Sequence, residues 1–171
     1  LPAQVVSVVS DVAGAAALRR AAAAGVPAEA VERQANEPRR AYDRRLADAV
    51  AGHEPHWVVL AGFMRLLSSD FLDHFPGRVV NLHPALPGEL PGLHAIERAH
   101  AEAATAGRTH TGVMVHLVPD EGVDDGPVLA TAIVPIHPDD SLDDLRQRVH
   151  TTEHHLLVFT LHQLCLQGAH P

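Results

Sequence analysis

The chain has 171 residues, 46% of them hydrophobic and 20% charged, with one cysteine and a formal net charge of −8 at pH 7. These values predict one cytoplasmic globular domain over residues 1–171, because no apolar run approaches the roughly 20 residues of a membrane span and no signal-peptide pattern begins the chain. A negative net charge repels polyanions, so we expect small-molecule partners, no nucleic acid and no membrane contact.

Short β-branched runs alternate with longer amphipathic stretches in the first half of the chain. Residues 5–9, 57–60 and 78–82 have the composition of strands, whereas residues 12–24 and 38–51 have the period of helices. The strand-like runs are apolar almost throughout, which is typical of strands covered on both faces. The pattern predicts an α/β fold that is Rossmann-like, with a mostly parallel twisted sheet and helices on both faces.

The second half of the chain predicts an antiparallel pair and one long helix. Residues 112–118 and 128–134 are two strand-like runs whose connection is too short for a helical crossover, so we expect them to pair antiparallel. Ser141 and Asp144 then have the spacing of a helix capping box. The apolar face that we expect to dock on the sheet consists of Leu142, Leu145, Val149, Thr152, Leu156 and Phe159.

The segment over residues 78–92, RVVNLHPALPGELPG, carries two polar residues at the end of an apolar strand. Strand period two places Asn81 and His83 on the same side, and Pro84 ends the ladder. Ligands of open α/β sheets bind at the carboxyl ends of strands, and an amide beside an imidazole suits a developing oxyanion. The alternative is that both residues only cap the strand and hold the loop.

A second loop contributes carboxylates. Residues 119–127, PDEGVDDGP, follow shortly after His116. One of these carboxylates, for which Asp124 is the candidate, could reach a histidine at a neighbouring strand end. It would then hold that ring protonated or collect a proton from an attacking amine through water. The alternative is an ordinary solvated carboxylate.

Four motifs in this order resemble the folate-dependent formyltransferases, and within them the glycinamide ribonucleotide (GAR) transformylases of purine synthesis. The likeness extends over nearly all of residues 1–168. The motifs are LAGFMRLL at residues 60–67, NLHPAL at 81–86 with PGLH at 91–94, TGVMVH at 111–116, and DEGVDDGPVL at 120–129.

The resemblance implies the formyltransferase fold and a one-carbon transferase that moves formyl from the co-substrate 10-formyltetrahydrofolate to the amine of GAR in de novo purine biosynthesis, without a metal. By similarity, Asn81 and His83 would polarise the formyl oxygen, and Asp124 would orient or protonate His83 and assist proton removal. The implied folate-binding residues are Phe63, Met64, Arg65, Leu66, Leu67 and Val123. The implied GAR-binding residues are His116, His150 and Glu153.

The chain also departs from the family pattern. Pro87 and Gly88 replace a leucine and a proline, and the family's first strand and phosphate loop have no counterpart. We therefore expect a chain that is truncated at its N-terminus, lacks the first strand and is shortened at its C-terminus. The fourteen histidines form no convincing metal-ligand set. The sequence leaves open whether the protein forms a homodimer.

Alternative functions are another 10-formyltetrahydrofolate enzyme, acting on methionyl-tRNA or a sugar amine or hydrolysing the folate, and a binding protein with a decayed site.

Overall fold

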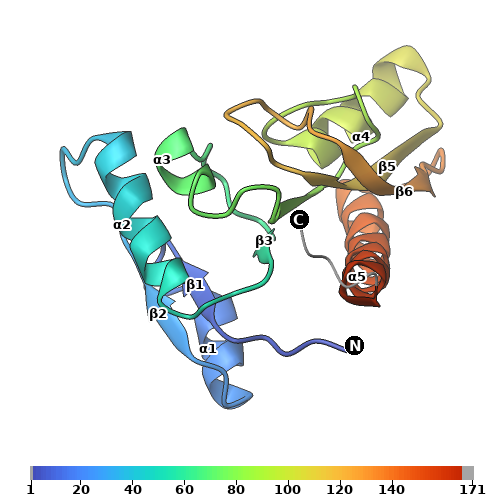
Figure 1. The fold of residues 1–171 in the computed structure, drawn as a ribbon. Helices are drawn as coiled ribbons and strands as arrows, with labels where there is room; N and C mark the ends of the chain where they lie inside the picture. Colours follow the sequence, from blue (N-terminus) through green and yellow to red (C-terminus); the bar gives the residue numbers. More distant parts are fainter. Residues whose placement is uncertain (1, 167–171) are drawn as a thin grey trace.

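The computed structural model describes residues 2–166 of the chain. Figure 1 shows β1, β2, α1 and α2 on one side of the molecule, and α4, β5, β6 and α5 on the other, with β3 between them. In chain order the elements are β1 (Val8–Ser10), α1 (Ala16–Ala23), β2 (Ala28–Ala30), α2 (Arg39–Ala51), β3 (Val58–Leu60), α3 (Ser69–Leu72), β4 (Val79–His83), α4 (Ala95–Ala106), β5 (His110–Leu117), β6 (Val128–Pro135) and α5 (Leu142–Leu166).

Parallel and antiparallel pairing are both present. β1 pairs parallel with β2, and β3 pairs parallel with β4. The predicted antiparallel pair is confirmed as β5 and β6, and β4 also pairs antiparallel with β5. The hydrogen-bonded strand order is β1-β2 in one sheet and β3-β4-β5-β6 in the other. The fold is therefore α/β with a mixed sheet whose antiparallel part lies in the C-terminal half.

The N-terminal elements are shorter than the sequence predicts. The first strand begins at Val8, and Val5 is 61% exposed, so the expectation of a covered strand over residues 5–9 is wrong at its start. The first helix begins at Ala16 instead of residue 12. The Ser10 hydroxyl accepts a hydrogen bond from the Val12 amide at 3.2 Å, and such local bonds compete with helical ones.

The long helix α5 begins as predicted. The Ser141 amide donates to the Asp144 carboxylate at 3.0 Å, and the Asp144 amide donates to the Ser141 hydroxyl at 3.2 Å, which confirms the capping box. Leu145 and Val149 are fully buried in the core.

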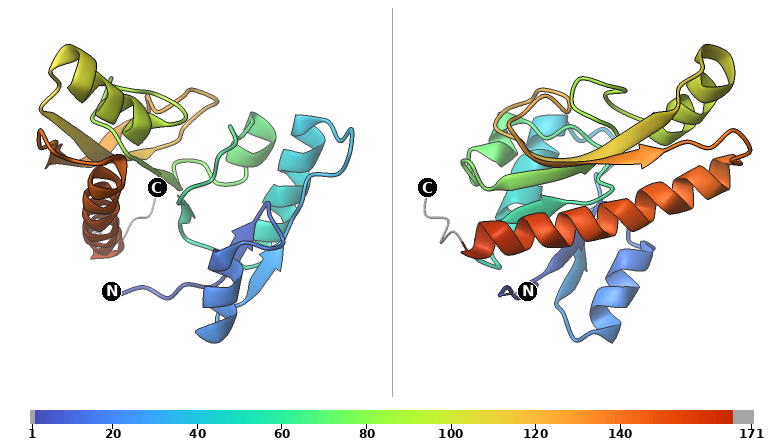
Figure 2. Two further views of the ribbon diagram at one scale, coloured as in Figure 1. Left: turned by 180° about the vertical axis from the view of Figure 1, so that it is seen from behind. Right: turned by 90° about the vertical axis from the view of Figure 1, so that its right-hand side faces the viewer.

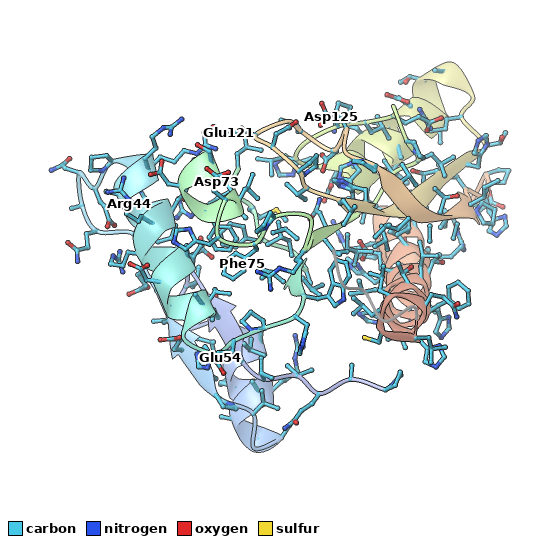
Figure 3. All side chains as sticks on the ribbon, viewed as in Figure 1. Arg44, Glu54, Asp73, Phe75, Glu121 and Asp125 are labelled. Atoms are coloured by element: carbon cyan, nitrogen blue, oxygen red, sulfur yellow. The ribbon has the colours of Figure 1, made fainter. Side chains whose placement is uncertain are left out.

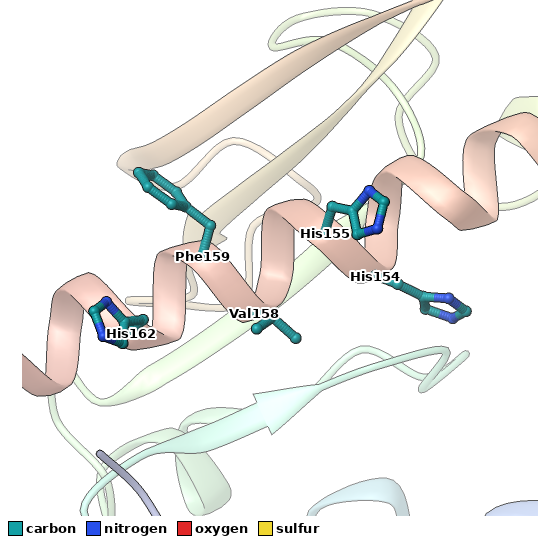
Figure 4. A pocket seen from close by; sticks show the side chains of 5 residues that line it. All are labelled: His154, His155, Val158, Phe159 and His162. Atoms are coloured by element: carbon teal, nitrogen blue, oxygen red, sulfur yellow. The ribbon is translucent and has the colours of Figure 1, made fainter. Parts of the chain in front are cut away.

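Phe159, in contrast, is 59% exposed, so its predicted place on the packed face is wrong. The buried residues of α5 are Leu145, Val149, Glu153 and Thr160, which share one face of the helix. Phe159 lies at the edge of that face, because the next residue, Thr160, is still covered along this long helix (Figure 2). Phe159 lies there beside Val158 and His162, where these residues line a shallow surface pocket (Figure 4).

The strand β4 lies between two hydrophobic cores. Val79 belongs to the core formed with α2 and α3, whereas Leu82 packs against the core formed with α4, β5, β6 and α5. Alternate residues of a strand face opposite sides, so Asn81 and His83 share the side of Val79. The carboxyl end of β4 is thereby held from both sides. Within residues 2–166, no helix is long and apolar enough to cross a membrane.

Candidate active site

The carboxyl end of β4 and the loop between β5 and β6 meet through side-chain hydrogen bonds. Asn81 Nδ2 donates to Asp124 Oδ1 at 3.1 Å. His83 Nδ1 lies 3.2 Å from Asp124 Oδ2. The structure thus brings Asn81, His83 and Asp124 together in one cluster.

His83 is only 4% exposed, and both of its ring nitrogens face hydrogen-bond acceptors. Nδ1 faces the Asp124 carboxylate, and Nε2 lies 3.1 Å from the carbonyl oxygen of Leu90. A neutral imidazole can donate through one nitrogen only, whereas the imidazolium donates through both. The two hydrogen-bond acceptors therefore favour the protonated form of the His83 ring.

Burial acts in the opposite direction. It lowers the pKa of the His83 imidazole below its ordinary value, and the Asp124 carboxylate and the Leu90 carbonyl oppose this shift without cancelling it. At rest and near neutral pH the ring is therefore mainly neutral. A hydrogen-bonded site that favours the charged ring, together with a burial that disfavours it, suits a group that exchanges protons during a reaction.

The Asp124 carboxylate is the common acceptor of the cluster. Besides Asn81 and His83, it accepts a hydrogen bond from the Gly92 amide, with a nitrogen-to-Oδ2 distance of 2.8 Å. Burial raises the pKa of the Asp124 carboxyl, but contact with His116, the Gly92 amide and the charge of His83 outweigh burial and hold that pKa below its ordinary value. Asp124 is therefore ionised at neutral pH.

The backbone of the Asp124 loop, residues 118–127, is shaped by two special positions. Asp124 itself has a φ of +54°, and Asp and Asn tolerate this left-handed region better than most residues. A Cβ added at Gly126 would overlap the Leu117 carbonyl oxygen, so the loop packs closely against the end of β5. These two features aim the Asp124 side chain at β4.

The turn before α4 supplies groups that the sequence does not predict as part of the site. Leu90 and Gly92 have φ values of +44° and +76°, which turn the Leu90 carbonyl to His83 and the Gly92 amide to Asp124. Arg98 on α4 holds this turn, since its Nη2 donates to the carbonyl oxygens of Leu90 at 2.7 Å and Pro91 at 2.6 Å. The PGLH motif marks the turn in the sequence, but backbone groups carry its contacts.

His116 lies behind Asn81 and is buried. Its Nδ1 donates to the Leu117 carbonyl at 2.9 Å, and its Nε2 lies 3.1 Å from Asn81 Nδ2 and 3.6 Å from Asp124 Oδ1. The structure therefore gives His116 a contact that orients the Asn81 amide. Its predicted contact with substrate stays a prediction.

The segment from Phe63 to Leu67 follows β3, and its side chains divide into two sets. Phe63 and Leu67 pack in the core with α2 and α3, whereas Met64, 66% exposed, and Leu66 face outward. Val123, also predicted to bind folate, is exposed on the Asp124 loop. The segment thus offers mostly backbone groups together with two exposed apolar side chains.

The Arg65 side chain is engaged within the protein. Its Nε lies 2.7 Å from Asp11 Oδ2, and its guanidinium lies 5.7 Å from the centre of the Tyr42 ring. This pairing connects the segment after β3 with the turn after β1. It also leaves the guanidinium less free to bind a ligand.

His150 and Glu153 form a pair on α5. His150 Nδ1 lies 2.6 Å from Glu153 Oε2, with His150 half-exposed and Glu153 largely buried. The hydrogen bonds of this pair join the two residues to each other and not to Asn81, His83 or Asp124. In the part of the chain that the structure describes, no group of three or more His, Cys, Asp or Glu residues is placed to hold a metal ion.

Comparison with known proteins identifies the family of this chain. The family model described as formyl transferase matches residues 1–161. The phosphoribosylglycinamide formyltransferase of Escherichia coli strain K12 is 43% identical over 148 residues, which are 86% of this chain and 68% of that protein. The trifunctional purine biosynthetic protein adenosine-3 of Drosophila melanogaster is 41% identical over 89% of this chain, which spans 11% of that longer protein.

A solved structure has the same fold. The crystal structure of phosphoribosylglycinamide formyltransferase from Bacillus halodurans superimposes with a TM-score of 0.90 at 36% identity, covering 99% of this chain and 84% of that one. These matches confirm the predicted resemblance, the formyltransferase fold and the assignment to enzymes that transfer a formyl group to GAR. The chain belongs to the formyl transferase family.

Proposed function

We propose that Asn81, His83 and Asp124 carry the transfer of a formyl group from 10-formyltetrahydrofolate to the amine of GAR. One observation supports this most: one partly buried carboxylate, Asp124, lies within hydrogen-bond distance of the Asn81 amide, the His83 ring and the Gly92 amide at the carboxyl end of β4. Formyl transfer needs a donor to an oxyanion, an acid and a proton acceptor around one carbonyl group, and this cluster holds all three.

The first step forms a bond between the GAR amine nitrogen and the formyl carbon, while the carbonyl electron pair moves to oxygen. Asn81 Nδ2 and His83 donate to that oxyanion, and the step proceeds from the minor fraction of the protein in which the His83 ring is protonated. In the resting structure the same donors point to Asp124 Oδ1 and to the Leu90 carbonyl, so the formyl oxygen takes the place of an acceptor that the protein already provides. Replacing a protein acceptor by the formyl oxygen changes the free energy little in the ground state. The same donors stabilise the formyl oxygen more strongly once negative charge develops on it.

The second step removes a proton from the attacking amine. The ionised Asp124 carboxylate accepts it directly or through one water molecule, which neutralises the ammonium. The intermediate then collapses: the carbon bond to N10 of the folate breaks, N10 takes the proton of the His83 ring, and tetrahydrofolate and formylated GAR leave. Asp124 then passes the amine proton to His83, so one proton has moved from the amine to N10 and both residues end as they began.

The two substrates have separate binding regions in this proposal. The folate ring lies between the backbone of residues 63–67 and the Asp124 loop, where Met64 and Val123 offer exposed apolar contact. GAR lies toward α5, where the Glu153 carboxylate accepts hydrogen bonds from ribose hydroxyls and His150 holds that carboxylate in place. His116 contributes by orienting the Asn81 amide toward the reacting groups.

The test measures the acceptor product directly. The protein that carries this chain is incubated with 10-formyltetrahydrofolate and GAR, and formylated GAR and free formate are quantified by mass spectrometry. We expect formylated GAR as the main product, a fall of at least a hundredfold in its rate for His83→Gln, and no change for His137→Gln, an exposed histidine away from the cluster. Formate without formylated GAR would show a folate hydrolase instead.

A further inference from the structure

Glu121 holds the Asp124 loop on the side opposite to the catalytic cluster. It precedes Asp124 by three residues, and its Oε1 accepts a hydrogen bond from the Ser69 amide at 3.0 Å and lies 3.2 Å from Arg40 Nη2. Its Oε2 lies 3.2 Å from Arg39 Nη2. Figure 3 shows Glu121 at α3 and Asp125 farther along the same loop.

The groups that receive Glu121 are themselves held in place. Arg40 also contacts Asp70 at 2.9 Å, so it is fixed between α3 and the loop. Just before α3, the buried Asp43 carboxylate on α2 accepts a hydrogen bond from the Ser68 amide at 2.8 Å. The binding site for the Glu121 carboxylate is therefore a preformed junction of α2 and α3, and does not depend on the loop.

Arg39 connects the two regions that are proposed to enclose the folate ring. Its Nε donates to the Leu66 carbonyl at 3.1 Å, while its Nη2 binds Glu121. One guanidinium thus contacts the segment after β3 and the loop that carries Asp124. The separation of these two segments is consequently set by a shared side chain.

We propose that Glu121, through Arg39, Arg40 and the Ser69 amide, acts as a latch that holds the Asp124 loop closed against α2 and α3. Glu121 is a positioning residue: it touches no reacting atom, but it keeps Asp124 seated against Gly92 and His83. The role in turnover rests on the proposed function of Asp124, whereas the role in closing the loop does not.

The expected strength of the latch follows from its exposure. Glu121 is 37% exposed and its two arginines are more exposed still, so each ion pair alone is weak. Two such pairs and one charged hydrogen bond to an amide should together favour the closed loop by about three- to tenfold. Because the contacts are at the surface, 1 M salt should remove most of this preference, since the Debye length falls to about 3 Å.

The variant Glu121→Gln tests the latch, because glutamine can still accept from the Ser69 amide but has no charge. Asp125→Asn is the matched control, since it removes the same charge from an exposed position of the same loop. Hydrogen exchange is measured at the Gly92 amide, whose bond to Asp124 Oδ2 exists only when the loop is closed. This readout needs no catalysis, so it separates failure of the latch from failure of the proposed function.

We expect exchange at the Gly92 amide to be three- to tenfold faster in Glu121→Gln than in the wild type at low salt, equal to it at 1 M salt, and unchanged in Asp125→Asn. The KM for 10-formyltetrahydrofolate should rise by the same factor, with kcat within twofold, because the closed loop, once formed, is unaltered. Equal exchange rates in all three proteins at low salt would overturn the latch. So would a lower KM in Glu121→Gln, which would show that Glu121 competes with the folate for Arg39.

Discussion

Replacing Asp124 by Asn removes a charge from the site while keeping its shape. Asparagine tolerates the φ of +54° at this position as well as aspartate does, so the loop need not change its path. The substitution, however, places a donor where the structure has only an acceptor. If the new amide oxygen takes the Gly92 hydrogen bond, the new amide nitrogen faces the Asn81 amide nitrogen, now 3.1 Å from Asp124 Oδ1.

The size of each effect can be worked from these contacts. One buried donor left without an acceptor costs about 1–3 kcal/mol of stability. The effect on catalysis is larger, because the variant loses both the proton acceptor and the charge that stabilises the His83 imidazolium at 3.2 Å. General acid–base groups contribute about a hundred- to ten-thousandfold, so we expect kcat to fall within that range.

The assay is the steady-state kcat at saturating GAR and 10-formyltetrahydrofolate, measured beside the midpoint of denaturant unfolding. Folate binding to Asp124→Asn should survive, since the proposed contacts of the ring are mainly to the backbone of residues 63–67. A kcat within threefold of the wild type, in a variant that is folded and binds folate, would refute the role of Asp124.

Three further outcomes are expected. Gly126→Ala should destabilise the protein by about 1–3 kcal/mol and lower kcat at least tenfold, because the added methyl group overlaps the Leu117 carbonyl and displaces the loop; chemical denaturation and steady-state kinetics measure both. Arg65→Ala should weaken binding of a folate analogue by less than about tenfold in calorimetry, because the guanidinium is paired with Asp11, and a loss on the order of a hundredfold would show that it anchors the folate. Stability should fall as the pH is lowered below about 6.5, because the folded pKa of His83 lies below its unfolded value and the unfolded chain takes up the proton first; His83→Gln should flatten this part of the stability curve.

The positions of Asn81 and His83 could be predicted because a strand has a simple period. Two polar residues separated by one residue at the end of an apolar run must share a side, and the structure places both beside Asp124. Gly126 and Pro127, which follow closely after Asp124, likewise indicate the turn. Side-chain chemistry and local spacing were sufficient for these residues.

The remaining parts of the site depend on backbone direction and on contacts distant in sequence. The Gly92 amide and the Leu90 carbonyl enter the site through left-handed backbone, which no side-chain pattern records. Glu121 reads as a solvated carboxylate because its partners, Arg39 and Arg40, are about 80 residues earlier in the chain. The periodicity that placed Leu145 correctly on α5 did not show that Phe159 lies at the edge of the packed face, where only contacts distant in sequence decide which side chains are covered.

The central claim is that His83 and Asp124 act as one unit in formyl transfer, and a double-mutant cycle tests it most directly. The kcat for formylation of GAR is measured for His83→Gln, Asp124→Asn and the protein with both substitutions, each checked for folding. Residues that act as a unit are strongly non-additive, so the double variant should be within threefold of the slower single variant. A double variant whose loss equals the product of the two single losses would contradict the claim.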